Sequence, residues 1–273
     1  MADISASMVK ELRDRTGVGM MEAKKALVAA EGDTEAAIKA LREAGVIKAG
    51  KKADRETTEG RICAATNGDS IVLVALACET DFVSRNDDFK ALAQKFADSV
   101  AAAATVDNPE QIAFVDGGTL DDALKAAVLK IGENLKIASA KMIKGDGTLG
   151  AYVHHDGKSG AIVRLTGASS DATQGVATQV AIHIVASKPI ALNRAAVDQK
   201  TIDEEREVYK KLVAAEGKPE NIQDKIVEGK INAFFKDRVL VEQGFCLDAK
   251  QVIGDMVKAA GGGEVAAYEA IFI

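Results

Sequence analysis

The sequence predicts an α+β fold, because helical and strand-like segments follow one another in separate blocks and do not alternate. Apolar residues recur at helical spacing up to about residue 45. The period then changes to strand-like runs over 61–78, and a second helical block begins near Gln199. The 273 residues, 47% of them hydrophobic, suffice for one large domain or roughly two to four small ones.

The first block is expected to form a small module of three short helices. Glycines separate its apolar runs, Asp33 is the expected N-cap of the third helix, and Gly45 is its expected end. The basic run 48–55 is expected to be a linker. Three helices over about 45 residues bury little surface, so such a module usually docks on a partner.

A strand hairpin is expected next. The strand-like runs 61–66 and 70–78 flank Asn67-Gly68, a strong hairpin signal because both residues tolerate positive φ. The second run is apolar on both faces, so we expect it to be the central strand of its sheet. Amphipathic helices follow around 89–100 and 120–131.

The rest of the chain is expected to hold a second sheet, a helical hairpin and a closing strand. Turn residues and changes of period set the boundaries. The expected elements are a three-strand meander of 135–143, 148–155 and 160–165, helix 171–187, a helical hairpin over 199–235 broken at 217–219, strand 239–241, helix 252–258 and strand 265–273.

Composition argues against several classes of function. A net charge of −6 is a poor basis for direct nucleic-acid binding, which needs clustered lysines and arginines. Three cysteines without CxxC spacing fit reduced thiols in the cytosol, and we expect a cytoplasmic protein. No signal peptide is visible, and no apolar run reaches about 18 residues, so no membrane association is expected.

The motifs of common enzyme and cofactor sites are missing. There is no GxxxxGK[ST] phosphate loop and no HExxH or paired Cys and His spacing, so we expect neither a cofactor nor a metal. His154 and His155 are adjacent on a predicted strand, so they should point to opposite faces and cannot easily share one ion. We therefore expect no catalytic residues and no enzyme activity.

The polar segment 79–88 stands out between the central strand and the next helix. One large apolar residue, Phe82, lies in its middle beside Asp81. One interpretation makes Phe82 a hydrophobic staple that packs under the next helix, with Asn86 or Asp87 as the N-cap of that helix. The other interpretation makes Phe82 part of a binding surface, and spacing alone favours the staple.

Five motifs along the chain resemble the elongation factor Ts family. They occur in the family's order, they span nearly the whole chain, and together they are far more specific than any one alone. The matching segments are VKELRDRTGVGMMEAKKAL at 9–27, TDFV at 80–83 with RND at 85–87, KIGEN at 130–134, ASKP at 186–189, and GKP at 217–219 with VEG at 227–229.

The resemblance implies a four-part architecture. It comprises a three-helix module similar to ubiquitin-associated domains, a core of two small α/β subdomains with antiparallel sheets, and a protruding helical hairpin. Since that hairpin serves dimerisation in some members, a homodimer is left open here. The corresponding parts are 1–55 for the module and linker, 56–146 for the core N-subdomain, 147–186 with 237–273 for the core C-subdomain, and 187–236 for the hairpin.

The resemblance also implies a function and a site. The expected activity is guanine-nucleotide exchange on elongation factor Tu, with GDP released when the partner's Mg²⁺ and phosphate site is disturbed. Thr80, Asp81, Phe82 and Val83 would enter the partner near its magnesium ion, and His154 would press on its phosphate-binding side. The family usually continues beyond the 265–268 strand, so a weaker C-terminal contact is expected for a chain that ends at Ile273.

Two other functions are compatible with parts of the sequence. An adaptor would use only the three-helix module to bind ubiquitin-like partners, and the isolated module would then carry the binding. A small hydrolase would pair Asp81 with His154. These two residues are far apart in sequence and nothing supplies an oxyanion hole, so the hydrolase is the weakest hypothesis.

Overall fold

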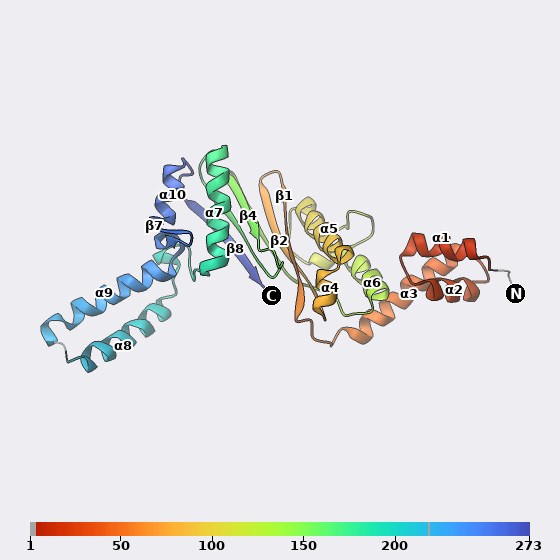
Figure 1. Ribbon diagram of the computed structural model, residues 1–273, viewed down its shortest axis with the longest axis horizontal. Helices are drawn as coiled ribbons and strands as arrows, with labels where there is room; N and C mark the ends of the chain where they lie inside the picture. The colour runs from red at the N-terminus through yellow and green to blue at the C-terminus, as the bar shows by residue number, and fades with distance from the viewer. Residues whose placement is uncertain (1–3, 218) are drawn as a thin grey trace.

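The computed structural model describes residues 4–217 and 219–273. It confirms the α+β class and shows an elongated molecule with a helical module at one end, a β-rich core in the middle and a helical pair projecting at the other end (Figure 1). None of the helices in these residues is long and apolar enough to cross a membrane.

The N-terminal module contains α1 (Ala6–Thr16), α2 (Met20–Ala29) and α3 (Thr34–Lys52). Leu12 and Leu27 are fully buried in its small core. The expected N-cap is confirmed, because the Asp33 carboxylate accepts a hydrogen bond of 3.0 Å from the Ala36 N–H. This cap fixes the start of α3, the helix that joins the module to the core.

The end of α3 differs from the sequence-based expectation. The helix does not stop at Gly45 but runs to Lys52, so most of the expected linker 48–55 is helical. Gly45 is buried where α3 meets α6 (Leu120–Ile131), and a Cβ added there would lie 3.1 Å from the Lys125 carbonyl oxygen. The glycine therefore permits a close approach of two helices, which sequence spacing alone cannot distinguish from a helix end.

The first sheet is antiparallel, with strand order β1 (Glu59–Asn67), β2 (Ser70–Cys78) and β3 (Lys136–Lys144). Every residue of β2 is buried, which confirms it as a central strand. The hairpin is also confirmed, but Asn67 still pairs with Ser70, so the two turn residues are Gly68, at φ 58°, and Asp69.

The expected three-strand meander is wrong. The second sheet is β4 (Thr148–Val153), β5 (Ser159–Leu165) and β8 (Val265–Phe272), whereas β3 pairs with β2 in the first sheet. A strand as buried as β2 needs a hydrogen-bonding neighbour on each side. Gly145 and Gly147, at φ 130° and 123°, carry the chain from one sheet to the other instead of closing a hairpin.

The two sheets pack face to face, and β2 contributes side chains to both faces of the first sheet. Ile71 and Leu73 point toward the second sheet and pack in one cluster with Ile162. The alternate residues Val74 and Leu76 point to the other side, under a helical layer. This double burial explains why the sequence of β2 shows no polar face.

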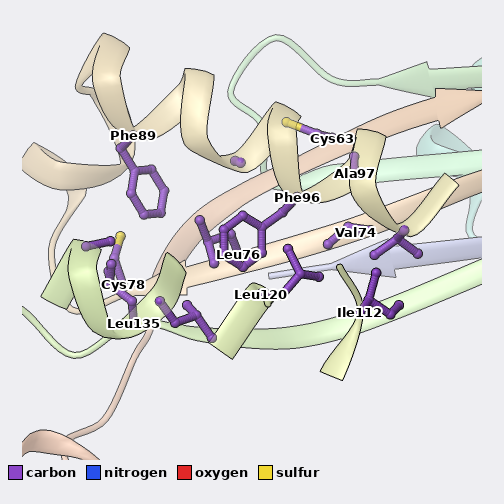
Figure 2. Packing of buried hydrophobic residues seen from close by; sticks show 14 of the residues in the cluster. Cys63, Val74, Leu76, Cys78, Phe89, Phe96, Ala97, Ile112, Leu120 and Leu135 are labelled. Atoms are coloured by element: carbon purple, nitrogen blue, oxygen red, sulfur yellow. The ribbon is translucent and has the colours of Figure 1, made fainter. Parts of the chain in front are cut away.

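Helices cover the outer face of each sheet. On the first sheet these are α5 (Asp87–Ala103) and α6, whose Phe89, Phe96 and Leu120 pack over Leu76 (Figure 2). A short helical turn, η1 (Pro109–Gln111), links the two helices. On the second sheet α7 (Asp171–Ser187) has the bounds expected from the sequence. The helices and the two sheets together form four layers in the order α–β–β–α.

The projecting pair consists of α8 (Gln199–Ala215) and α9 (Glu220–Arg238), preceded by the turn η2 (Arg194–Ala196), and it confirms the predicted helical hairpin (Figure 1). Its small hydrophobic cluster meets that of the second sheet at the partly buried Val241. The chain enters and leaves the hairpin at adjacent points, because Ala191 forms a bridge with Val239. Lys218 of the expected 217–219 break lies outside the described residues.

The segment after the hairpin holds one wrong prediction. Instead of a strand at 239–241, the chain forms the 3-10 turn η3 (Leu240–Glu242), because the N–H groups of Glu242 and Gln243 donate hydrogen bonds to the Val239 carbonyl. The apolar residues there reflect burial and not sheet pairing. A small ribbon of β6 (Gly244–Phe245) and β7 (Asp248–Val252) was not predicted, and α10 (Ile253–Ala259) and β8 were.

The inter-sheet packing yields a stability prediction. Leu73→Ala should lower the free energy of unfolding by about 2–5 kcal/mol, because it opens a cavity between two sheets that cannot easily collapse. Leu247→Ala, at a position 77% exposed, should change it by less than about 0.5 kcal/mol. Denaturant titration followed by circular dichroism measures both, and an equal, small effect would contradict the sandwich.

The cysteines yield a second prediction. Burial raises the pKa of the Cys63 thiol to about 11 and that of Cys78 to about 12, so both stay protonated at pH 8. Cys246 is exposed. Iodoacetamide at pH 8 should label Cys246 alone in the native protein and all three cysteines after unfolding, as read by peptide mass spectrometry. Early labelling of Cys78 would show that the end of β2 opens readily.

Candidate functional site

The segment after β2 forms a short helix, α4 (Asp81–Arg85), held by two consecutive caps. Thr80 is its N-cap and accepts a hydrogen bond from the Val83 N–H at 3.4 Å. Asn86 then caps α5, accepting from the Asp88 N–H at 2.8 Å. Polar side chains in this segment therefore satisfy the first N–H groups of two helices, and the chain turns sharply between them.

Phe82 points away from the core, so the staple interpretation is wrong. Its side chain is 84% exposed, more than any other large apolar residue in the described part of the chain. The next residue, Val83, packs on the core instead, and Phe89 at the start of α5 is buried. Since neighbouring positions on a helix lie about 100° apart, turning Val83 inward directs Phe82 outward.

Asp81 lies beside Phe82 on the same exposed turn. Its carboxylate forms an ion pair of 3.1 Å with Arg85, and its main-chain oxygen accepts a hydrogen bond from the buried Ser84 hydroxyl. The ion pair is open to solvent, so the association between the two side chains is weak and readily exchanged. The Asp81 carboxylate is therefore accessible to groups on a second molecule.

The base of this segment is held by residues that sequence reasoning did not assign to the site. The Glu133 carboxylate accepts hydrogen bonds from the N–H groups of Glu79 and Thr80 at 3.0 and 3.1 Å, and from the Thr80 hydroxyl at 2.5 Å. In return, the Asn134 N–H donates to the Glu79 carboxylate at 2.6 Å, which lowers the pKa of Glu79. In the sequence, Glu133 and Asn134 stand out only as part of the KIGEN motif at 130–134.

A groove of about 660 Å³ lies next to Phe82. Phe82 and Val83 line it from α4, Thr16 lines it from the N-terminal module, and residues of α5 and α6 complete it. Ion pairs on its lining, such as Lys130 with Asp88 at 3.1 Å, make its rim polar. Phe82 thus stands at the edge of a hollow to which both the module and the core contribute.

The second candidate region is the turn after β4. The strand ends at Val153, so His154 and His155 do not alternate across a sheet as expected, and their ring centroids lie only 4.1 Å apart. The Nδ1 atom of His154 lies 3.1 Å from the Asp156 carboxylate. The Lys158 N–H and, more weakly, His154 lower the pKa of Asp156. The contacts of Asp156 with His154 and Lys158 therefore hold the turn that carries His154.

The structure brings the two candidate regions to the same end of the sandwich. The turn that follows His154 contacts β1, because the Ile62 N–H donates to the Gly157 carbonyl at 2.8 Å and Lys158 forms an ion pair of 2.7 Å with Glu59. In the first sheet, Glu59 lies opposite Cys78, the last residue of β2 before the candidate segment. A partner approaching this end could therefore meet both regions.

The geometry does not support chemistry at these residues. Asp81 pairs with Arg85 and His154 with Asp156, so the two members of the hydrolase hypothesis do not pair with each other. Within residues 4–217 and 219–273, no three His, Cys, Asp or Glu side chains gather closely enough to hold a metal ion. The exposed apolar ring on a fixed base is instead typical of a protein-binding site.

Comparison with known proteins agrees with this conclusion. The family model for elongation factor Ts matches residues 79–271. Elongation factor Ts of Christiangramia forsetii is 42% identical over 278 residues, covering 99% of each chain. Those of Chloroherpeton thalassium and Arthrospira platensis are each 41% identical, covering 94% and 91% of this chain and 92% and 100% of their own. The chain therefore belongs to the elongation factor Ts family, the guanine-nucleotide exchange factors of elongation factor Tu in translation elongation, and not to a family of catalytic enzymes.

Proposed function

We propose that the segment of Thr80, Asp81, Phe82 and Val83, the N-cap and first residues of α4, is the part of this chain that drives GDP out of elongation factor Tu. It is called the 80–83 loop below. The observation that carries the proposal is the exposure of Phe82 on a loop whose base is tightly hydrogen-bonded. Burying such a side chain against a partner contributes about 1.5–3 kcal/mol, which is available for distorting the partner's nucleotide site.

The mechanism is mechanical and electrostatic. Phe82 enters between helices of the GTPase, and the neighbouring Asp81 carboxylate competes for groups that hold the magnesium ion. GDP binding depends heavily on that ion and on phosphate contacts, so disturbing either weakens it. The coupling is reciprocal, because an exchange factor that lowers nucleotide affinity must have its own affinity lowered by the same factor when nucleotide binds again.

Two further contacts complete the proposed interface. His154, at the same end of the sandwich as the 80–83 loop, presses on the phosphate-binding side of the GTPase. The N-terminal module, which shares the groove beside Phe82, makes the other contact with the GTPase domain. These roles follow the division of the chain inferred from the sequence. The module is 1–55, and the two core subdomains are 56–146 and 147–186 with 237–273. We expect the activity in the cytoplasm.

The role of Phe82 as a wedge between helices of the GTPase is tested by measuring the release of a fluorescent GDP analogue from bacterial elongation factor Tu. The wild-type protein should accelerate release strongly, Phe82→Ala should lose about tenfold or more of that acceleration, and His154→Ala should lose less. Phe82→Ala should fold normally, because the side chain is exposed and supports no core packing.

Leu247→Ala is the matched control, since it removes an exposed apolar side chain from the β6–β7 turn and should leave the rate unchanged. Full acceleration by Phe82→Ala would move the mechanism to Asp81, His154 or the module. A folded wild-type protein without any effect on release would contradict the proposed activity.

Self-association through the α8–α9 hairpin is a separate proposal. Val208 and Leu212 are one helical turn apart on α8 and are 56% and 46% exposed, so they form a small apolar strip on a projecting element. Light scattering should show a dimer for the wild-type protein and a monomer for Leu212→Glu, with Leu247→Glu as control. A wild-type monomer at all concentrations would rule this homodimer out.

A further inference from the structure

We propose that Glu133 is a positioning residue for nucleotide exchange, which sets the direction in which the 80–83 loop presents Phe82. The inference rests on the function proposed above for that loop. Glu133 lies 53 positions after Thr80 in the sequence, yet its carboxylate makes three hydrogen bonds to the first residues after β2.

The three hydrogen bonds replace the sheet at the point where it ends. The pairing of β1 with β2 stops at Glu59 and Cys78, so the N–H groups of Glu79 and Thr80 need other acceptors. One carboxylate oxygen of Glu133 accepts both, and the other accepts the Thr80 hydroxyl. Bonds to a charged acceptor are stronger than neutral ones, so this is a firm attachment for a loop at the surface.

The attachment is reciprocal. The Glu79 carboxylate accepts the Asn134 N–H at 2.6 Å, so each of the two segments supplies a carboxylate for the main chain of the other. With two opposed carboxylates, the segments can neither slide past each other nor rotate without breaking several bonds at once. The direction of α4, and with it that of Phe82, is therefore set by the 133–134 turn.

The same turn also holds the connection to the N-terminal module. The Asn134 side chain, which is buried, donates to the Arg55 carbonyl at 2.8 Å and to the Ala53 carbonyl at 3.3 Å, just beyond the end of α3. Two adjacent residues, Glu133 and Asn134, thus hold the 80–83 loop and the chain segment that follows α3. The two proposed contacts with the GTPase are aligned by one turn.

The turn itself is well placed to act as a fixed point. Gly132 ends α6 in the left-handed region, at φ 85°, and the buried Leu135 leads into β3. Glu133 and Asn134 are therefore held between a helix and a strand that both belong to the core of the first sheet. A side chain on such a support loses little entropy when it binds the loop.

Glu133→Gln tests the inference with little change of shape. Glutamine keeps the side-chain volume but removes the charge, so the N–H groups of Glu79 and Thr80 lose their charged acceptor. Its amide nitrogen cannot accept a hydrogen bond, so the contact with the Thr80 hydroxyl is kept only if its direction is reversed. The stimulated rate of GDP release should fall about tenfold, with a smaller change in the concentration that gives half of the maximal rate. Glu110→Gln, at an exposed position, should behave as wild type.

Two readouts separate positioning from general destabilisation. Adding Glu133→Gln to Phe82→Ala should slow release by less than about twofold, because both changes act through the same side chain. Amide hydrogen exchange at Glu79 and Thr80 should accelerate in Glu133→Gln, whereas amides in the centre of β2 stay protected. Glu133→Asp, which keeps the charge but not the reach, serves if the glutamine variant folds poorly, and it should lose rate in the same way.

The outcomes are distinguishable. A wild-type rate for a folded Glu133→Gln, or a full tenfold loss on top of Phe82→Ala, would overturn the positioning role while leaving the proposed exchange activity intact. If Phe82→Ala itself exchanges at the wild-type rate, the wedge fails and the positioning role fails with it. Faster hydrogen exchange at Glu79 and Thr80 would then show only that Glu133 stabilises the loop.

Discussion

The burial of β2 on both faces is the constraint on which the rest of the structure depends. One set of its side chains packs against the second sheet and the alternate set packs under α5 and α6, so the strand belongs to two hydrophobic clusters at once. A strand held in this way cannot shift its register without exposing apolar surface on both sides. Its last residue, Cys78, is therefore a rigid starting point for whatever follows.

In the function proposed above, that rigidity allows a loop of modest size to act on another protein. The 80–83 loop begins directly at the end of β2, and Glu133 and the caps at Thr80 and Asn86 hold it at its base. Only the tip, with Asp81 and Phe82, is open to solvent. An exposed aromatic ring on a flexible loop would fold over on binding, whereas one on a braced loop can transmit force to the partner.

Much of the fold was predictable from periodicity and turn residues. The strand pair around Gly68, helix α7 and the α8–α9 hairpin all follow from local patterns that the tertiary structure does not override. The errors share a physical origin in non-local contacts. The pairing of β3 with β2 depends on an edge far away in sequence, and the role of Gly45 depends on a helix that packs against it. Val239 and Leu240 were assigned to a strand because burial gives a turn the same composition as a strand.

The candidate site was only partly accessible from the sequence. Family resemblance pointed to Thr80, Asp81, Phe82, Val83 and His154, but spacing alone favoured a buried Phe82, because it cannot tell which of two adjacent apolar residues faces inward. The structure shows that Val83 takes that place. The contribution of Glu133 was hidden for a different reason, since two of its three partners are main-chain N–H groups, which nearly every residue carries.

The bridge between Ala191 and Val239 has a consequence for how this architecture can vary. Because the chain leaves the core and returns to it at neighbouring points, the α8–α9 hairpin is in effect an insertion with its ends already joined. Its hydrophobic cluster meets that of the second sheet at its base, where Val241 packs against both, so the sandwich relies little on the hairpin for burial. Lengthening, shortening or exchanging the hairpin leaves the strand connectivity of the core unchanged, which makes this the part of the molecule most open to evolutionary change and to grafting of new binding surfaces.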